Sequence, residues 1–335
     1  MAKGYRIDIA VARLFAIVEV VFFHAYGMTY ASAHLPADVA SMYRDKYEIF
    51  NQSYLINIAM PLFTTISGFL FCTQMISGKY ASLRGVVWDK FKRLMIPYFV
   101  FTILFMFTTN SVGLAPFYNW NYWHLWYLPM LFWGLVICYL IRNVIFIRGG
   151  DLALMILTFA ISIINIRMPV IIGLGNIPNY MCWLMLGFVL CRHEAYILNA
   201  MAKYHLVWGM IIVYLVISVF YPTPFGEEES LQGQTASLLA VVSLWYIFHL
   251  IPWDRYKITK YLLILSSCSF GIYIFHNWIE VYMVSSTAKR LFPIVEFAKA
   301  HIYLFPFLFS SVAFVISLGI TWLFRKTRIG RFLVG

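Results

Sequence analysis

The sequence predicts an all-α, polytopic membrane protein of about ten transmembrane helices with both termini in the cytoplasm. Three observations lead to this fold class. The 335 residues are 62% hydrophobic and only 12% charged, whereas soluble domains carry about 25% charged residues. Long apolar segments recur along the whole chain, separated by charged or Pro/Gly-rich stretches. The Lys and Arg residues concentrate in alternate connecting segments, as expected when these face the cytoplasm.

Ten apolar segments are the predicted membrane helices. They cover residues 7–28, 53–76, 94–111, 124–142, 152–167, 169–190, 205–221, 234–252, 261–284 and 302–324. The fifth is short and is separated from the sixth only by Pro169. The segments 29–52, 112–123, 222–233 and 285–301 are expected to be outer loops. No connecting segment is long enough for a separate soluble domain, so residues 1–335 are expected to be one transmembrane domain.

The placement of basic residues fixes the predicted orientation. With the N-terminus inside, the inner segments hold about three times as many Lys and Arg residues as the outer segments. The acidic run Glu227-Glu228-Glu229 falls outside. The formal net charge of +11 therefore reflects cytoplasmic loops, and we expect membrane lipids rather than nucleic acid around the chain. The expected location is a bacterial inner membrane.

Charged residues inside a membrane helix cost about 2.5 kcal/mol or more, so each is a functional candidate. The first predicted helix contains Arg13 and His24. Eleven residues are three helical turns plus about 20°, which places both side chains along one face, about 16 Å apart. The simpler interpretation is an arginine that reaches the inner interface and a histidine that lies in the outer one. Glu19 and Glu280 are two further carboxylates in predicted helices, and the sequence assigns them no role.

Two more histidines fall in the outer half of predicted helices. His124 opens the fourth helix and His276 lies late in the ninth. A general base is the favoured role for such a histidine, because imidazole titrates near neutrality and can accept a proton from a hydroxyl group. A zinc site is an alternative, but no Cys or carboxylate accompanies these histidines at metal-ligand spacing. We therefore expect no metal.

A basic pair lies before the third helix. Lys90 and Arg93 are three residues apart, so on a regular helix they share a face and can bind phosphate groups together. Ordinary cytoplasmic positive charge explains the same pair without a ligand.

Five segments together resemble the acyltransferase-3 family of integral membrane acyltransferases. The first is the Arg-x10-His pattern of Arg13 and His24. The others are Met60-Pro61-Leu62-Phe63 with Ser67-Gly68-Phe69, the stretch from Lys90 to Tyr98, the stretch His124-Leu125-Trp126-Tyr127-Leu128-Pro129, and the stretch from Ser269 through Gly271 to His276. They occur in the family's order and cover nearly the whole chain. Departures are Ala10 and Leu14 near the first arginine, and a lysine at position 90 where the family's pair has arginine.

The resemblance implies an O-acyltransferase that takes an acyl group, most often acetyl, from cytoplasmic acyl-CoA. The implied acceptor is a hydroxyl group of an extracytoplasmic or lipid-linked carbohydrate, and acyl-CoA is a co-substrate rather than a bound cofactor. His24 is then the catalytic histidine and Arg13 a donor-channel residue. Lys90 and Arg93 would bind the CoA end. His124, Trp126, Tyr127 and His276 would orient the acceptor or polarise the thioester carbonyl.

Several alternatives stay open at this level. His24 acts either as a general base or as a transient acyl carrier. Ser67-Gly68 and Gly271 are expected to permit close helix approach rather than catalysis. A transporter or flippase for a lipid-linked glycan or acyl species also suits ten helices with buried charges, although the sequence shows no inverted repeat and no matched broken helices. A metal-dependent membrane hydrolase that uses the three histidines is the third candidate.

Overall fold

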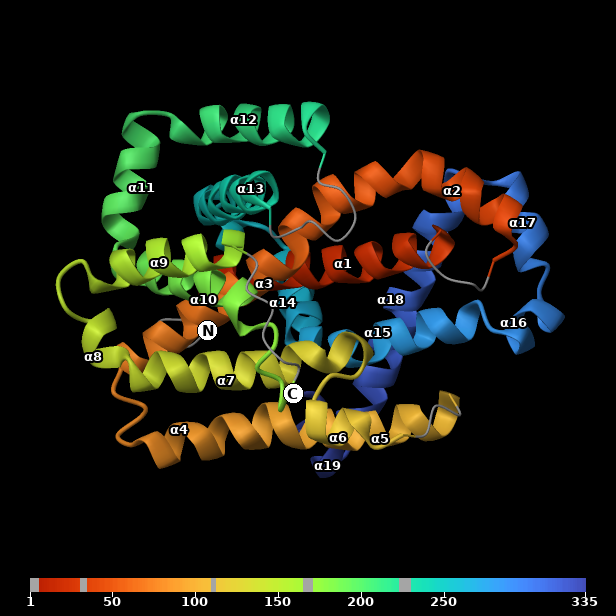
Figure 1. Ribbon diagram of the computed structural model, residues 1–335, viewed down its shortest axis with the longest axis horizontal. Helices are drawn as coiled ribbons and strands as arrows, with labels where there is room; N and C mark the ends of the chain where they lie inside the picture. Colours follow the sequence, from red (N-terminus) through yellow and green to blue (C-terminus); the bar gives the residue numbers. More distant parts are fainter. Residues whose placement is uncertain (1–5, 31–34, 110–112, 165–170, 223–229) are drawn as a thin grey trace. The chain divides into compact units, whose positions relative to one another are not determined.

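A computed structural model of the chain describes residues 6–30, 35–109, 113–164, 171–222 and 230–335. Within these ranges every regular element is helical, which confirms the all-α prediction. The chain divides into two compact units, and Figure 1 labels their helices. The first unit comprises residues 1–60, 214–228 and 247–335, and the second comprises 61–213 and 229–246. The expectation of a single transmembrane domain stays a prediction.

The first unit is built around α1 (Ile7–Tyr30). Its other elements are α2 (Ala37–Phe50), a π-helical turn (Asn51–Leu55), a 3-10 turn (Trp253–Arg255), α14 (Thr259–Ser267), α15 (Ser269–Met283), α16 (Ser286–Leu291), α17 (Ile294–Ala300), α18 (Leu304–Phe324) and α19 (Arg328–Val334).

The second unit begins within α3 (Ile56–Ile76). It continues with α4 (Leu83–Lys90), a π-helical turn (Phe91–Met95), α5 (Ile96–Thr109), α6 (Ala115–Asn119), a 3-10 turn (Trp123–Trp126), α7 (Tyr127–Leu140), α8 (Arg142–Ile145), α9 (Gly150–Ile164), α10 (Ile177–Arg192) and α11 (Glu194–Lys203). The last two helices are α12 (Leu206–Phe220) and α13 (Leu231–Leu250). Each begins in the second unit, and its last residues belong to the first unit.

Small residues let the helices of each unit pack closely. In the first unit, α1 packs against α14, α15 and α18, and a Cβ atom at Gly271 of α15 would lie 2.4 Å from Cγ2 of Thr321 in α18. In the second unit, a Cβ atom at Gly68 would lie 2.3 Å from the Leu184 carbonyl oxygen. Both contacts confirm the close approach predicted for these glycines.

Each of the ten predicted spans falls on a helix, but the helices differ in length. Five stretches are long and apolar enough to cross a membrane: Ala37–Ile76, Leu83–Thr109, Ala115–Leu140, Leu231–Leu250 and Leu304–Phe324. The number becomes seven if each of two bent pairs is one span, namely α10 with α11, bent by 84°, and α14 with α15, bent by 65°. The apolar helices α9 and α12 have only 15 residues each. The described residues therefore form a multi-pass membrane protein, and the number ten stays a prediction.

The start of the sixth predicted span is wrong. Residues 171–176 form turns, and α10 begins at Ile177. Gly173 has a φ of +79°, and a Cβ atom there would lie 2.4 Å from Cβ of Pro129, so this position cannot continue a helix. Pro178 then occupies the first turn of α10, where its missing N–H group is no loss. Pro169 lies outside the described residues.

Three expected outer loops contain helices instead. Helix α2 lies within 29–52, α6 within 112–123, and α16 and α17 within 285–301. Tertiary contacts explain α2 and α17, because the hydroxyl group of Tyr43 donates to the Ala298 carbonyl at 2.8 Å and Lys299 pairs with Asp38 at 2.8 Å. Short helices gain most of their stability from such packing. Of the fourth loop, residues 231–233 belong to α13, and residues 223–229 lie outside the described residues.

Candidate functional site

Two of the three predicted site histidines meet in the first unit. The ring centroids of His24 in α1 and His276 in α15 lie 5.2 Å apart, with the ring planes tilted by 49°. His276 is fully buried and His24 is half-buried. Because α1 and α15 pack along each other, residues 252 positions apart in the sequence form one imidazole pair.

A backbone carbonyl group fixes the protonation of His276. Its Nδ1 atom lies 2.7 Å from the Tyr273 carbonyl oxygen, and the Ile272 oxygen is 3.3 Å away. A carbonyl oxygen only accepts hydrogen bonds, so Nδ1 carries the hydrogen and donates. In the neutral ring the lone pair is then on Nε2. The imidazole ring of His276 therefore has a fixed orientation beside His24.

A buried carboxylate follows His276 by one helical turn. Glu280 is 0% exposed, and neither of its carboxylate oxygens has a hydrogen-bond partner among the described residues. The spacing of four residues puts Glu280 and His276 on one side of α15. Unpaired carboxylates are costly inside a membrane protein and are commonly functional.

The arginine of the first helix contacts the break between α14 and α15. Nη2 of Arg13 donates to the Ser266 carbonyl oxygen at 3.0 Å and to Ser266 Oγ at 3.1 Å. Ser266 lies in the last turn of α14, where carbonyl groups lack helical partners and a positive charge is favourable. Arg13 and His24 thus face the same bent helix pair, Arg13 at its break and His276 beside His24.

A second guanidinium group lies at this break, and sequence reasoning missed it. Nη1 of Arg325 lies 2.7 Å from Ser267 Oγ and 3.1 Å from Cys268 Sγ. In the sequence, Arg325 follows the last predicted helix and is expected only to contribute to the positive charge of the cytoplasmic side. The available signal is the polar run from Ser266 to Ser269, which interrupts an apolar segment and marks the 65° bend.

The basic pair of the second unit is split by a π-helical turn. Lys90 is 7% exposed, with Nζ 3.3 Å from Gln74 Oε1 and 3.7 Å from Asp89 Oδ2. Arg93 is exposed. Lys90 is the last residue of α4, whereas Arg93 lies within the turn Phe91–Met95, which has more residues per turn than an α-helix. The shared face expected for a regular helix is therefore interrupted, and only Arg93 is open to solvent.

The remaining predicted site residues lie together in the second unit. His124 is 4% exposed and its ring centroid is 6.2 Å from that of Phe105. Tyr127 is buried, and Thr64 Oγ1 donates to its hydroxyl oxygen at 3.4 Å. The Trp126 ring centroid lies 5.2 Å from that of Tyr180. A 3-10 turn carries His124 and Trp126, so a short rigid element presents an imidazole and two aromatic rings.

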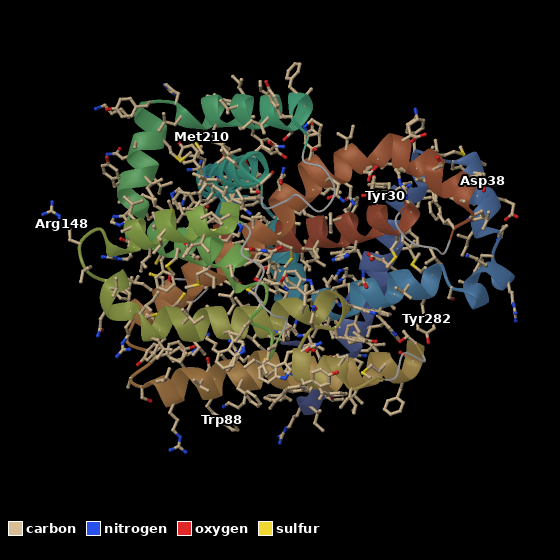
Figure 2. The ribbon with its side chains drawn as sticks, in the orientation of Figure 1. Tyr30, Asp38, Trp88, Arg148, Met210 and Tyr282 are labelled. Carbon is tan, nitrogen blue, oxygen red and sulfur yellow. The ribbon has the colours of Figure 1, made fainter. Side chains whose placement is uncertain are left out.

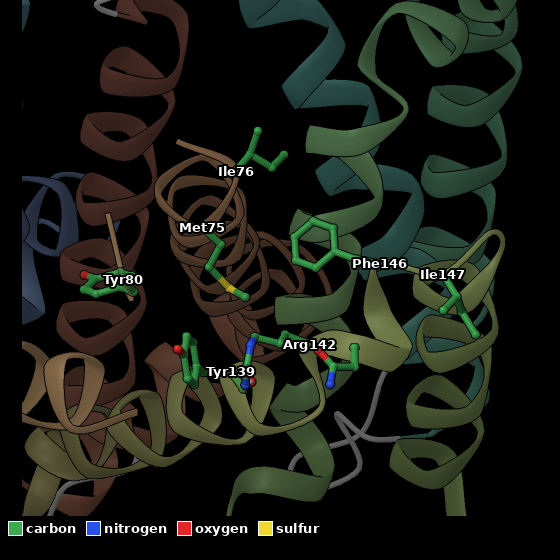
Figure 3. Close-up of a pocket in the computed structure, with 8 residues that line it drawn as sticks. Met75, Ile76, Tyr80, Tyr139, Arg142, Phe146 and Ile147 are labelled. Carbon is green, nitrogen blue, oxygen red and sulfur yellow. The ribbon is translucent and has the colours of Figure 1, made fainter. Parts of the chain in front are cut away.

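The second unit also contains a pocket of about 620 Å³ (Figure 3). Its lining residues are Met75, Ile76, Tyr80, Tyr139, Arg142, Asn143, Phe146 and Ile147. The Arg142 guanidinium carbon is 4.3 Å from the centroid of the Tyr139 ring, and Nη1 donates to the Tyr139 carbonyl at 3.0 Å. A guanidinium group beside aromatic rings suits a ligand that combines a heteroaromatic ring with phosphate.

Within the described ranges, no group of three or more His, Cys, Asp and Glu side chains is arranged to hold a metal ion.

The fold and this site define a class of protein: a multi-pass helical membrane protein in which two histidine rings from separate helices are in contact. The sequence model of the acyltransferase-3 family, described as an acyltransferase domain, matches residues 6–326. The match covers nearly the whole chain, so the chain belongs to this family and is an acyltransferase. No curated protein and no solved structure matches the chain.

Proposed function

We propose that the chain is a membrane O-acyltransferase that moves an acyl group, most often acetyl, from cytoplasmic acyl-CoA to a hydroxyl group of an extracytoplasmic or lipid-linked carbohydrate. The proposal includes ten transmembrane spans, cytoplasmic termini and a bacterial inner membrane. The observation that supports it is the contact between His24 and His276, in which a backbone carbonyl group orients the His276 ring.

The proposed chemistry needs one proton acceptor at the histidine pair. A base removes the proton from the acceptor hydroxyl, whose oxygen then attacks the thioester carbonyl. The C–S bond breaks and the CoA thiolate leaves, taking up the proton. His24 either performs the deprotonation or carries the acyl group between donor and acceptor. His276 Nε2 is the second basic atom in either version.

The donor is proposed to bind at basic side chains. Arg93 is exposed at the edge of the second unit, and Arg142 lines the pocket of Figure 3. In this scheme Lys90 and Arg93 belong to the CoA-binding surface, and Arg13 lies on the path of the thioester. His124, Trp126 and Tyr127 are proposed to orient the acceptor or to polarise the carbonyl, because aromatic rings and hydrogen-bonding groups suit a sugar ring.

The test is the replacement of His24 by Ala in purified protein supplied with acetyl-CoA. We expect acyl transfer to fall by about 10²-fold or more. His301→Ala is the matched control, because His301 is exposed and is expected to retain activity. Normal turnover by His24→Ala with normal expression would discard the assignment. Trapping of an acyl-enzyme with hydroxylamine distinguishes the acyl-carrier version from the general-base version.

A transporter remains the second candidate, because one observation favours it. Transporters use discontinuous helices, and each unit contains one bent pair, α14–α15 in the first and α10–α11 in the second. The sequence alone indicated no such breaks. Consumption of acetyl-CoA by purified protein in detergent, where no gradient exists, supports the transferase; transport in vesicles without consumption supports the transporter.

A further inference from the structure

The π-helical turn between α2 and α3 buries three consecutive polar side chains. Asn51, Gln52 and Ser53 are 1%, 2% and 0% exposed. Buried polar groups are costly unless they are hydrogen-bonded, and single π-helical turns within helices occur frequently at functional sites. The outer segment 29–52 therefore ends in a polar cluster at the start of α3.

The side-chain amide nitrogen atoms of this cluster form hydrogen bonds, whereas its side-chain oxygen atoms do not. Asn51 Nδ2 donates to the Tyr30 hydroxyl oxygen at 2.9 Å, and Gln52 Nε2 lies 3.4 Å from the same oxygen. Asn51 Oδ1, Gln52 Oε1 and Ser53 Oγ have no hydrogen-bond partner among the described residues. Three unused acceptor atoms from adjacent residues require a ligand that supplies several donors.

The backbone of the turn is held in place by other side chains. The Ser53 carbonyl oxygen accepts from Asn57 Nδ2 at 2.8 Å and from Ser218 Oγ at 3.3 Å. These contacts fix the main chain without using the three open acceptor atoms. The cluster is thus rigid before a ligand arrives, which reduces the entropy lost on binding.

Helix α1 connects this cluster to the histidine pair. Gly27 lies three residues after His24, on the same side of α1 and about 4.5 Å along the axis. A Cβ atom at Gly27 would be 3.6 Å from Asn51 Nδ2, so the amide group of Asn51 packs against the α1 backbone. Tyr30, which holds both amide groups, lies at the C-terminal end of α1 (Figure 2). The cluster therefore begins about one helical turn beyond His24.

We infer that Asn51, Gln52 and Ser53 bind the hydroxyl groups of the acceptor next to the hydroxyl that is acylated. None of the three is charged, so a neutral ligand fits, and two amide oxygen atoms with a serine hydroxyl group on consecutive residues match the hydroxyl groups of a polyol such as a sugar ring. This inference rests on the proposed function and names the residues that recognise its acceptor. Asn51, Gln52 and Ser53 are positioning residues, whereas the histidine pair performs the chemistry.

The test compares Gln52→Met and Ser53→Ala with Ser310→Ala. Ser310 is a matched control, because it is a fully buried serine of the first unit whose Oγ already donates to the Pro306 carbonyl. Purified protein receives acetyl-CoA and methyl glucoside, and both the sugar ester and free acetate are measured. We expect Gln52→Met and Ser53→Ala each to lower the ratio of ester to acetate about tenfold at unchanged total acetyl-CoA consumption. Ser310→Ala should leave the ratio unchanged.

A binding measurement separates this inference from the proposed function. Saturation-transfer NMR with methyl glucoside, without acyl-CoA, should give a signal in the wild-type protein that Gln52→Met loses. An unchanged ester ratio, a parallel fall in acetyl-CoA consumption, or no sugar signal in the wild type overturns the acceptor site. A sugar signal without any acetyl-CoA consumption keeps the site and refutes the transferase.

Discussion

His24 and His276 lie with their ring centroids 5.2 Å apart although they belong to opposite ends of the chain. The contact depends on α15, which presents His276 to α1 and anchors its Nδ1–H group on the Tyr273 carbonyl. This hydrogen bond fixes the orientation of the His276 imidazole ring beside His24. Glu280 lies on the same side of α15 as His276, so its replacement tests whether it contributes to the reaction.

Replacing Glu280 by Gln is predicted to raise stability and lower activity. The change keeps the size of a side chain that is 0% exposed and removes an ionisable carboxyl group without a hydrogen-bond partner among the described residues. Ionisation of a carboxyl group in such a place is unfavourable, and natural proteins keep such groups for function. We expect the melting temperature in detergent to rise by about 2 °C or more and acyl transfer to fall about tenfold.

Glu296→Gln is the control for this experiment, because Glu296 is exposed in α17. It should change neither quantity. A more stable Glu280→Gln protein with full activity would show that the carboxylate has no part in the reaction.

Replacing Gly271 by Ala is predicted to destabilise the first unit. The added Cβ atom would lie 2.4 Å from Thr321 Cγ2 and 2.9 Å from Thr321 Cβ, so α15 and α18 must separate. Overpacking of this kind costs about 1–3 kcal/mol. Thermal unfolding in detergent measures the loss, and Thr321→Ala in the same chain should restore part of it.

Gly319→Ala serves as the matched change, since Gly319 lies in α18 and no atom lies within 4 Å of the Cβ position. It is expected to be neutral or slightly stabilising. Equal melting temperatures for Gly271→Ala and Gly319→Ala would contradict the close helix contact.

The sequence predicts the helices and the histidine pair better than their connections. Long apolar segments identify α3 and α18, which have 21 residues each, because crossing a membrane requires about this length. The sequence places His24 and His276 at a similar depth, because both fall in the outer half of their predicted helices. Their contact distance depends on the packing of α1 against α15, which no local pattern records.

The π-helical turns and the helix break were not predictable in the same way. Each π-helical turn has only five residues, too few to show a periodicity of its own, so the turns Asn51–Leu55 and Phe91–Met95 have no clear sequence signal. Each turn nevertheless affects where polar side chains lie. In the first turn Gln52 is buried, and at the second turn Lys90 is buried whereas Arg93 is exposed. The contact of Arg13 with Ser266 likewise joins residues 253 positions apart.

Replacing Asp151 by Ala is predicted to destabilise the second unit. Asp151 is fully buried and pairs with Arg192 Nη1 at 3.0 Å and with His193 Nε2 at 2.8 Å. Removing one partner of a buried ion pair leaves an uncompensated charge and costs about 3–5 kcal/mol. The melting temperature should fall clearly, whereas Asp254→Ala, at an exposed position, should leave it unchanged. A neutral Asp151→Ala would mean that solvent reaches this pair.

Replacing Arg13 separates its structural contact from its proposed donor role. Arg13→Ala removes two hydrogen bonds to Ser266 in the last turn of α14, so we expect a loss of about 1–3 kcal/mol. Ser266→Ala removes only the Oγ contact, and a double-mutant cycle of the two changes should show coupling of about 1 kcal/mol. Arg13→Lys keeps the charge and should retain part of the stability.

The proposed donor role predicts a kinetic effect that a purely structural role does not. The KM for acetyl-CoA should rise in Arg13→Ala but not in Ser266→Ala. If the KM is the same in both variants, Arg13 stabilises the helix break and does not bind the donor.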